Sequence, residues 1–201
     1  MSADARASLL HLLARISFKL GSFTLSSGGV SDYYIDCRTT TLHAEGARLT
    51  GLALLHLMEE HGLRPAAVGG LTMGADPVVS AVSVASAWRA RGDASAALIH
   101  GFLVRKAEKA HGTGRRIEGF FEEQARVVIV DDVCTTGAST IQAIAAAEAA
   151  GMQVIAALCL VERTEAGGRP GVEAALGGKA PFLSLFTADQ VRAEHVSHLA
   201  L

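Results

Sequence analysis

Two adjacent carboxylates, Asp131 and Asp132, follow an apolar stretch, RVVIV, and precede a short loop rich in threonine, glycine and serine. The loop opens a predicted helix, so backbone N–H groups and a helix N-terminus converge there, as in many phosphate-binding sites. Hydroxyl donors are added by Thr135, Thr136, Ser139 and Thr140. The carboxylates would repel phosphate but suit vicinal sugar hydroxyls, directly or through a divalent cation. One anionic end and one diol end predict a ribose 5-phosphate ligand.

Other interpretations of this segment are weaker. An arbitrary Asp-Asp pair after a strand more often only caps a turn, but here the flanking strand, glycine and hydroxyls favour a binding site. The sequence holds no GxxxxGK[ST] string, and no apolar stretch is followed by GxGxxG. The Walker phosphate loop and the dinucleotide fingerprint are therefore excluded.

A second segment, residues 104–118, concentrates positive charge. It holds two acids, Glu108 and Glu118, and five cations, Arg105, Lys106, Lys109, Arg115 and Arg116. Its local charge is +3, so the rest of this −2 chain sums to −5. A charge run is ordinarily a solvated face, but opposite a phosphate site it suits a clamp for a diphosphate leaving group. Gly112 and Gly114 predict a loop able to close over a ligand.

The composition of the chain limits the class of protein to which it can belong. The chain has 201 residues, of which 50% are hydrophobic and 19% charged, and this predicts one globular domain over 1–201. The small net charge argues against nucleic-acid or anionic-membrane partners. The apolar run 66–88 is interrupted by glycines and Asp76-Pro77, so we expect no membrane span. Three widely spaced cysteines, Cys37, Cys134 and Cys159, predict free thiols and a cytoplasmic protein.

Hydrophobic periodicity and turn signals predict the elements that position both segments. Short strands are expected within 17–29 and 31–38, and Asp76 is expected to cap a helix that runs to about Arg91. Thr187 and Gln190 resemble a capping box for a final helix. Further helices are predicted at 4–16, 43–61 and 140–150, further strands at 66–71, 95–104, 126–130, 152–161 and 181–186, and a loop at 131–139.

Continuous apolar strands alternating with helices predict an α/β fold, a parallel sheet flanked by helices on both faces. We expect an α/β core over about 43–186. A smaller lobe, here called the hood, would be formed by about 1–42 together with the C-terminal segment. Ligands in such folds bind beyond the carboxyl ends of the strands. The predicted site loops are 69–76, 104–119, 131–139 and 162–169.

Other clusters of reactive residue types are less promising. His56, Glu59, Glu60 and His61 have neither HExxH nor HxxEH spacing, so we expect no metal site there. His195 and His198 are expected to be exposed to solvent. The sequence contains no GxSxG, and nothing near Cys134 suggests an activated nucleophile.

The segment DDVCTTGAS (131–139) resembles the phosphoribosyl diphosphate motif of the type I phosphoribosyltransferases. Within that family the chain is most similar to the orotate phosphoribosyltransferases. Segments 23–38, 103–119 and 159–165 match them in order and spacing, and the RKxxKxHG string is absent from purine-specific members.

The resemblance implies a reaction and an assembly. It implies a type I phosphoribosyltransferase-like fold and an enzyme that transfers the 5-phosphoribosyl group from phosphoribosyl diphosphate to orotate. The products are orotidine 5′-monophosphate and diphosphate, in pyrimidine biosynthesis. It also implies Mg²⁺, bound mainly through the substrate rather than by protein ligands, and a homodimer in which loop 104–118 is shared across the interface.

The resemblance also assigns roles to individual residues. It implies catalytic roles for Lys109, Asp131 and Asp132, and contacts to orotate from Thr135 and Arg163. An arginine just past a strand end suits a carboxylate-bearing pyrimidine, although taken alone Arg163 would pair with Glu162 or Glu165. Tyr33 and Tyr34 match an aromatic pair near the base, whereas periodicity alone makes them strand core. The residues implied to bind phosphoribosyl diphosphate are Arg105, Lys106, Lys109, His111, Asp131, Asp132, Val133, Cys134, Thr135, Thr136, Gly137, Ala138 and Ser139.

The chain departs from the family pattern at two places. Many members carry a lysine near Ser26 or Ser27 and another near Met73, and this chain has neither. There are two rival functions. A phosphoribosyltransferase for another base would share residues 126–140 but would not need the 105–111 string. A non-catalytic regulator that keeps the fold to sense phosphoribosyl diphosphate would usually add a basic DNA-binding segment, which is not visible here.

Overall fold

The computed structural model of the protein describes residues 2–24, 29–93, 95–106 and 116–199. Its centre is a sheet in the order β5-β4-β3-β6-β7-β8. The neighbouring strands from β4 to β8 are parallel, and β5 is antiparallel to β4. The strands are β3 (Ala67–Leu71), β4 (His100–Val104), β5 (Ile117–Gly119), β6 (Arg126–Cys134), β7 (Gln153–Glu162) and β8 (Phe182–Thr187).

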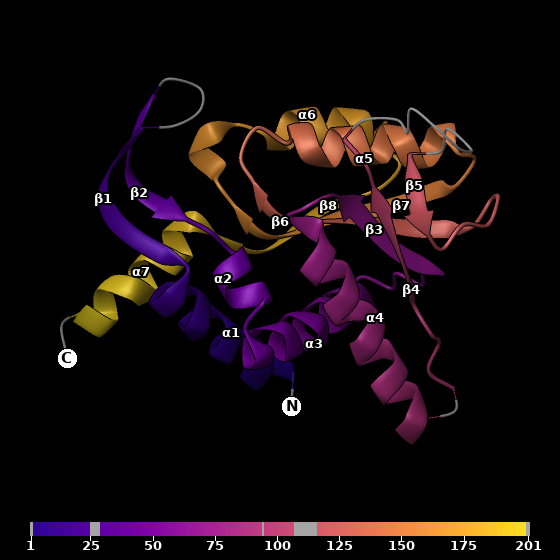
Figure 1. The fold of residues 1–201 in the computed structure, drawn as a ribbon, viewed down its shortest axis with the longest axis horizontal. Coiled ribbons are helices and arrows are strands. Elements are labelled where there is room, and N and C mark those ends of the chain that lie inside the picture. Colours follow the sequence, from indigo (N-terminus) through magenta and orange to yellow (C-terminus); the bar gives the residue numbers. More distant parts are fainter. Residues whose placement is uncertain (1, 25–28, 94, 107–115, 200–201) are drawn as a thin grey trace.

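Helices cover both faces of this sheet, as predicted. In Figure 1, α5 (Ala138–Ala149) and α6 (Arg169–Ala175) lie on one face, while α3 (Ala44–Glu60) and α4 (Ala75–Gly92) lie on the other. The burial of strand β6 on both faces explains why its sequence is continuously apolar. Val127 and Ile129 pack in the cluster beneath α5, and Val128 and Val130 pack in the cluster on the opposite face. Both faces need apolar side chains because neither meets water.

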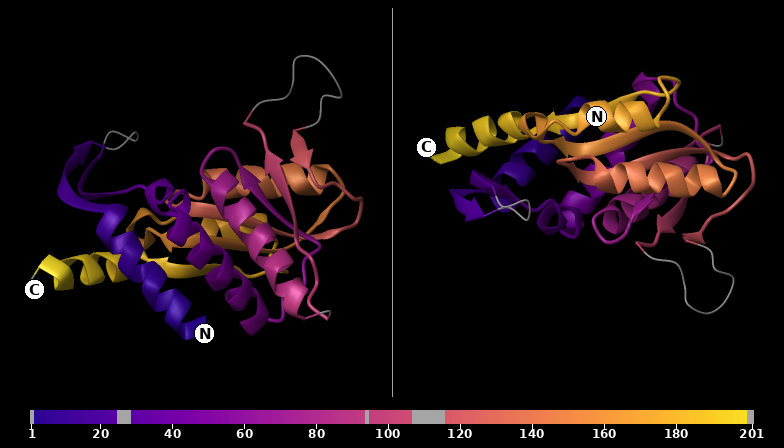
Figure 2. Two further views of the ribbon diagram at one scale, coloured as in Figure 1. Left: turned by 60° about the horizontal axis from the view of Figure 1, so that its bottom comes forward. Right: turned by 90° about the horizontal axis from the view of Figure 1, so that it is seen from above.

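A second, two-stranded antiparallel sheet pairs β1 (Phe18–Thr24) with β2 (Val30–Ile35). Strand β2 alternates strictly, with Ser31, Tyr33 and Ile35 buried and the residues between them exposed. Around it lie α1 (Ser2–Ile16), the short α2 (Arg38–Thr41) and the C-terminal α7 (Ala188–Leu199). Figure 2 shows α1 beside α7, and the two are joined where His195 Nδ1 lies 2.7 Å from the Ala14 carbonyl oxygen.

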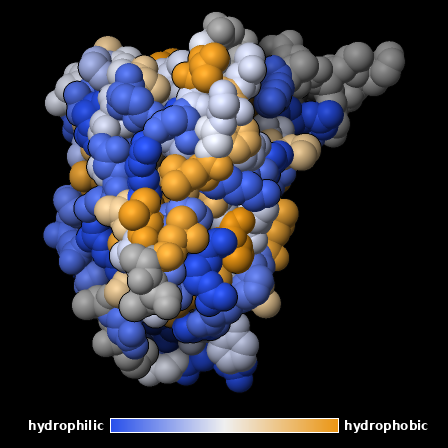
Figure 3. Space-filling model, turned by 90° about the vertical axis from the view of Figure 1, so that its left-hand side faces the viewer, coloured by the Kyte–Doolittle hydropathy of each residue, from blue (hydrophilic) through white to orange (hydrophobic). Residues whose placement is uncertain are grey.

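These elements share one hydrophobic cluster with the main sheet. Leu9 and Leu13 of α1 and Phe18 of β1 belong to the same buried cluster as Val128 and Leu158. On the outer side, Figure 3 shows hydrophobic groups scattered among hydrophilic ones on the face that carries β1, β2 and α7. The exposed large apolar side chains of these three elements are Leu20, Val30, Tyr34, Val196 and Leu199.

Several element boundaries differ from the sequence prediction. Strand β6 does not end before the aspartates, because Asp131 to Cys134 pair with Cys159 to Glu162 of β7. Helix α4 begins at Ala75 with Gly74 as its N-cap, so Asp76 lies in the first turn instead of capping it. Strand β4 begins at His100, later than expected. The sequence signals did not reveal α2, α6, β5 or the 3₁₀ turn Thr164–Ala166.

Two other local predictions, the capping box and the free cysteines, are confirmed. Thr187 N–H donates to Gln190 Oε1 at 2.9 Å and Gln190 N–H donates to Thr187 Oγ1 at 3.2 Å, which is the reciprocal pattern of a capping box. All three cysteines are free and buried. Among the described residues, no helix combines the length and apolar character needed to cross a membrane.

Candidate functional site

A pocket of about 400 Å³ opens where the carboxyl ends of β3 and β6 meet β2 and α2. This is the edge at which parallel sheets of this kind bind ligands. Its walls come from four regions. They are the segment from β2 to α2 (Tyr34, Ile35, Asp36, Arg38), the end of β3 and the turn after it (Leu71, Thr72, Met73, Gly74), the end of β6 with the start of α5 (Asp131, Asp132, Val133, Thr135, Ser139), and two cations from elsewhere (Lys106, Arg163).

The loop between β6 and α5 depends on one glycine. Gly137 has a φ of 76° and is the N-cap of α5, and a Cβ there would lie 2.6 Å from Val172 Cγ2. A side chain would therefore be strained both by the backbone and by the neighbouring helix. Helix α5 begins at this turn, and Thr135 and Ser139 on either side of it line the pocket. Thr136 and Ala138 are exposed beside them.

Asp131 is the more deeply buried of the two acids, with 5% of its surface exposed. Its Oδ2 accepts a hydrogen bond from Thr140 Oγ1 at 2.9 Å and its Oδ1 accepts from the Asp132 N–H at 3.0 Å. Burial, and then the charge of Asp132, raise the pKa of Asp131 to about 7. Thr140 is buried and faces this carboxylate, so the prediction that its hydroxyl joins the phosphate loop is wrong.

Asp132 is half-buried and closer to the pocket opening. Its Oδ1 accepts from the Val133 N–H at 2.9 Å. Burial raises the pKa of Asp132, and this hydrogen bond and, to a smaller extent, the Arg38 charge oppose that rise. Across from it stands the turn after β3, in which the Thr72–Met73 peptide bond is cis. A Cβ on Gly74 would lie 2.5 Å from Asp132 Oδ1, so the carboxylate has room only because residue 74 is glycine.

Asp36 and Arg38 form part of the site that sequence reasoning missed. The Arg38 guanidinium donates to both Asp36 carboxylate oxygens at 2.8 Å, and this pairing lowers the pKa of Asp36. Both side chains line the pocket next to the acids of β6. Both residues were expected at the end of the strand predicted within segment 31–38. An Asp-Cys-Arg triplet, however, does not indicate any particular chemistry.

Arg163 lines the pocket from the end of β7, with only 9% of its surface exposed. Its Nε donates to the Tyr33 hydroxyl at 2.8 Å and to Glu165 Oε1 at 3.0 Å, and its Nη2 donates to Ser31 Oγ at 3.2 Å. The guanidinium also lies over the Tyr33 ring, 4.6 Å from its centroid. The ion pair with Glu165 and the place in the pocket therefore coexist, whereas Glu162 pairs with Arg169.

The two tyrosines of β2 lie in different environments. Tyr33 is buried, stacks on Phe18 with 5.2 Å between ring centroids, and bonds through its hydroxyl to Arg163 and Glu165. Burial raises the pKa of Tyr33 to about 12, so it stays protonated and can donate. Tyr34 lines the pocket instead. Periodicity, which made both tyrosines strand core, was right for Tyr33 and wrong for Tyr34, whose side chain is exposed.

Only the ends of the cationic segment are described. Lys106 lines the pocket, and Arg105 pairs with Glu118 at 3.1 Å across β4 and β5. The predicted site residues Lys109 and His111 lie outside the described residues, as do Ser26 and Ser27.

Comparison with known proteins shows the family. No protein-family model matched the chain. The curated orotate phosphoribosyltransferase of Thermosynechococcus vestitus is 44% identical over 192 residues, which is 95% of each chain. The Mycobacterium tuberculosis orotate phosphoribosyltransferase solved with Fe(III) dicitrate superposes with a TM-score of 0.78 at 35% identity, over 93% of this chain and 98% of that one. The chain belongs to the orotate phosphoribosyltransferase family.

Membership confirms the predicted fold class and the prediction of a phosphoribosyl-transferring enzyme. The M. tuberculosis member has also been solved with phosphoribosyl diphosphate, with a TM-score of 0.73 at 32% identity over 94% of this chain and 99% of that one. In the present chain, most of the described residues predicted to bind substrate surround one pocket. They are Lys106, Asp131, Asp132, Val133, Thr135, Ser139 and Arg163.

Arg105, Thr136, Gly137 and Ala138, also predicted to bind substrate, do not line this pocket, and neither does Cys134. It is the last residue of β6, its side chain packs in the cluster beneath α5, and burial raises the pKa of its thiol to about 11. Only its backbone can face a ligand, and the thiol is protonated and shielded, as expected for a structural cysteine.

The remaining histidine predictions had mixed outcomes. His56 forms an isolated ion pair with Glu60 one turn along α3. His195 and His198 are half-buried rather than exposed, because α7 packs against α1 on that side. Periodicity on α7 alone could not show this, since the partner helix is the first element of the chain.

Proposed function

We propose that this pocket is where the protein transfers the 5-phosphoribosyl group from phosphoribosyl diphosphate to N1 of orotate, releasing orotidine 5′-monophosphate and diphosphate. The observation that carries the proposal is the juxtaposition of two chemically opposite surfaces. The N-terminus of α5 with Thr135 and Ser139 suits an anion, and the carboxylates of Asp131 and Asp132 suit a diol. A ribose 5-phosphate presents both groups.

The 5-phosphate would be held by the N–H groups of 135–139, including those of Thr136, Gly137 and Ala138, with the hydroxyls of Thr135 and Ser139. The ribose hydroxyls would meet Asp132, which is nearer the opening, while Asp131 is fixed behind it by Thr140. The diphosphate would then extend toward Lys106 and Arg105, with Lys109 and His111 completing the clamp. Preorganised donors of this kind cost no rearrangement when charge develops.

The residues present fit Mg²⁺ carried mainly by the substrate. Mg²⁺ prefers oxygen ligands, keeps several waters and is commonly bound by one or two carboxylates together with substrate phosphates. The carboxylate oxygens of Asp131 and Asp132 line the pocket and are the donors that would face such an ion, directly or through sugar hydroxyls. When bound, the ion would neutralise charge on the diphosphate.

Orotate would lie between Thr135, Tyr34 and Arg163. Three hydrogen bonds through Nε and Nη2 hold the Arg163 guanidinium in place, and among the described residues Nη1 has no hydrogen-bond partner. A fixed, largely buried cation is suited to the carboxylate or a ring carbonyl of a pyrimidine.

The chemistry then needs little from general acid–base groups. We propose a dissociative transition state with oxocarbenium character, in which the protein positions the two substrates, neutralises the leaving diphosphate and excludes water. Orotate can supply an anionic nitrogen, so none of the pocket carboxylates is needed as a base. Lys109, Asp131 and Asp132 are the proposed catalytic residues.

We also propose the assembly and the division of the chain. The active unit would be a homodimer in which loop 104–118 serves the neighbouring site, and the hood of 1–42 with the C-terminal segment would close over the core of 43–186. The packing of the hood on the core is supported by a hydrogen bond between them, which Arg163 of the core donates to the Tyr33 hydroxyl of the hood. A cytoplasmic location is supported by three unpaired cysteines.

An orotate-consumption assay tests the proposal. We expect orotate loss that requires both phosphoribosyl diphosphate and Mg²⁺, with little turnover of adenine, hypoxanthine or uracil. Turnover of another base in place of orotate would establish the first rival. Tight binding of phosphoribosyl diphosphate without turnover of any base would establish the non-catalytic sensor.

A further inference from the structure

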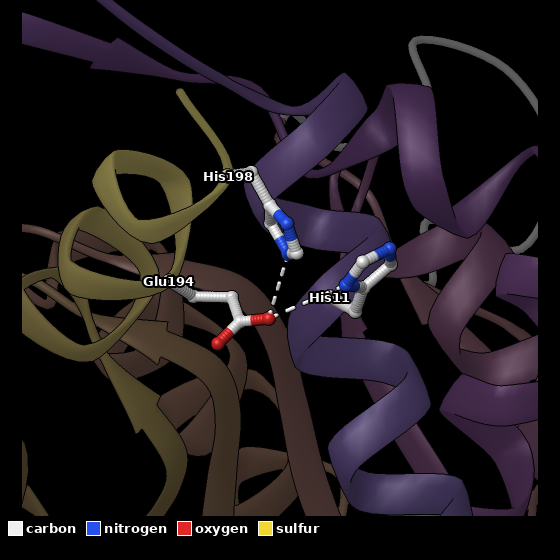
Figure 4. Close-up of side chains that lie close together, drawn as sticks. All are labelled: His11, Glu194 and His198. Atoms are coloured by element: carbon white, nitrogen blue, oxygen red, sulfur yellow. Dashed lines mark hydrogen bonds and ion pairs between the residues drawn. The ribbon is translucent and has the colours of Figure 1, made fainter. Parts of the chain in front are cut away.

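Outside the pocket, three metal-ligating side chains converge at the seam between the first and last helices. His11 comes from α1, and Glu194 and His198 come from α7, one turn apart. Figure 4 shows both imidazoles directed at the same Glu194 oxygen. His198 Nε2 lies 2.9 Å and His11 Nδ1 lies 3.3 Å from Oε1, and the three donor atoms lie within 4.8 Å of one another.

We propose that His11, Glu194 and His198 form a binding site for a zinc-like divalent transition-metal ion. With bonds of about 2.0–2.1 Å to imidazole nitrogen and carboxylate oxygen, neighbouring ligands of a tetrahedral ion lie roughly 3.3 Å apart. The two nitrogen–oxygen separations are already close to that value. Small rotations of these half-buried side chains would admit the ion without moving either helix.

The donor set selects the type of metal. Two imidazoles and a carboxylate suit Zn²⁺ and its neighbours, whereas Mg²⁺ prefers oxygen ligands alone. The site would therefore not compete for the ion that accompanies phosphoribosyl diphosphate. Glu194 is ready to bind as a carboxylate, because its bond to His198 and then that to His11 lower its pKa.

Binding requires an exchange of protons at the imidazoles. Each nitrogen that faces Glu194 must present its lone pair, so a neutral ring carries its proton on the other nitrogen, and a protonated ring releases one proton to solvent. The side chains are 43%, 30% and 30% exposed for His11, Glu194 and His198, so that solvent can accept this proton and a water can occupy the fourth position.

The consequence would be a cross-link between the two ends of the chain. His11 and Glu194 are 183 residues apart in sequence, and α1 and α7 are already neighbours. A ligand that binds only the folded arrangement stabilises it by mass action. None of the three residues lines the pocket, so the ion would act on stability and leave basal turnover unchanged.

The test is a zinc titration of the full chain by calorimetry, in chelator-free buffer without substrates. We expect one Zn²⁺ per chain in the micromolar range. His11→Ala, Glu194→Gln and His198→Ala should each weaken binding by at least about 10–100-fold, the loss seen even for residues that only support ligands. The matched control is His56→Ala, which removes the two-residue His56–Glu60 pair of α3 and should leave the affinity unchanged.

Two further measurements keep the test independent of folding defects. At zinc about tenfold above its Kd, the wild-type melting temperature should rise by about 3–5 °C and that of Glu194→Gln should not. Co²⁺ bound to the wild type should give the intense visible absorption of a tetrahedral ion. The proposal would be overturned by a lack of zinc binding, by ligand variants that bind zinc like the wild type, or by an octahedral cobalt spectrum.

Discussion

The two charged regions of the pocket are built in different ways. The acids of β6 belong to a central strand, pair with β7 on one side and are held by Thr140 and by backbone N–H groups. The cations of the 104–118 segment come from the far end of the sheet, where Arg105 is paired with exposed Glu118 and Lys106 is exposed. The first region is a fixed part of the core, and the second is attached to a sheet edge.

This difference indicates that the two regions serve different purposes, one in binding the substrate and the other in stabilising the leaving group. A group embedded in the core is held at one position, which suits recognition of the ribose phosphate, a part of the substrate that does not change during the reaction. A group at the edge is free to meet charge that appears only on the leaving diphosphate. Substitutions in the two regions should therefore separate in their effects on binding, turnover and unfolding.

The largest effect is expected from Asp131→Asn combined with Asp132→Asn. Each change removes a charged partner worth about 1.5–3 kcal/mol, so kcat/KM should fall by roughly two to four decades, chiefly through phosphoribosyl diphosphate binding. Asparagine keeps the volume and can still accept from Thr140, so the melting temperature should change little. Steady-state kinetics with a melting curve measure both. A large loss of stability with unchanged substrate affinity would contradict the assignment of these acids to the ligand.

Next in size is Lys109→Ala, from the cationic segment. Loss of one transition-state donor costs about 10²–10³ in kcat, and we expect turnover to fall more than substrate affinity. Measurement of kcat and of phosphoribosyl diphosphate affinity on the same preparation tests the split. An equal fall in affinity and unchanged kcat would show a ground-state contact instead.

Mixing this variant with Asp132→Asn tests whether the cationic segment acts across subunits. If the segment works across a dimer, a mixed dimer contains one site with both parts intact, and activity should recover to at most about half of wild type per mixed dimer. No recovery despite demonstrated subunit exchange would mean that each segment closes over its own site.

A smaller effect is expected from Arg163→Ala. Loss of one charged hydrogen bond of about 1.5–3 kcal/mol should weaken orotate binding by one to two decades and leave phosphoribosyl diphosphate binding nearly unchanged. Tyr33→Phe is the matched variant, since it removes a hydroxyl that holds the guanidinium without removing the cation, and should give a milder loss. A fall confined to phosphoribosyl diphosphate affinity would make the base-binding assignment wrong.

The smallest expected effect concerns pH and stability. Asp131 has a folded-state pKa of about 7, raised from 3.8, so the folded state holds a proton that the unfolded state releases. The contribution of this group to stability is therefore greatest below about pH 4 and declines as pH rises to about 7. Urea unfolding at pH 5 and pH 7.5 should show a steeper decline for wild type than for Asp131→Asn. Parallel declines would show that Asp131 titrates normally.

Much of the fold could be predicted because it depends on local patterns. Val127 to Val130 are apolar on both faces, which requires a covered strand, and Thr187 with Gln190 formed the expected cap. The end of β6 could not be found in this way. Two aspartates look like the start of a loop, and only their pairing with Cys159 to Glu162 of β7 keeps them in the sheet.

The site was predictable where a short segment carries the chemistry and not where distant segments meet. The β6 loop holds its strand, hydroxyls and glycine within one stretch of sequence. By contrast, Thr140 has the same residue type as its neighbours, and only its position on α5 turns it toward Asp131. Asp36 and Arg38 reach the pocket because β2 and α2 pack over the sheet, and no local pattern records that contact.

The contact between α1 and α7 has a consequence for the order of events during synthesis. The first helix leaves the ribosome long before the last one, yet Arg6 donates to the carbonyl of Leu185 in β8, and Phe18 and Ala14 contact His195 on α7. Until α7 has been made, part of the apolar surface of α1 and β1 has no partner. A nascent chain stalled before α7 is therefore expected to bind chaperones that recognise exposed apolar surface, and to fold to completion only on release.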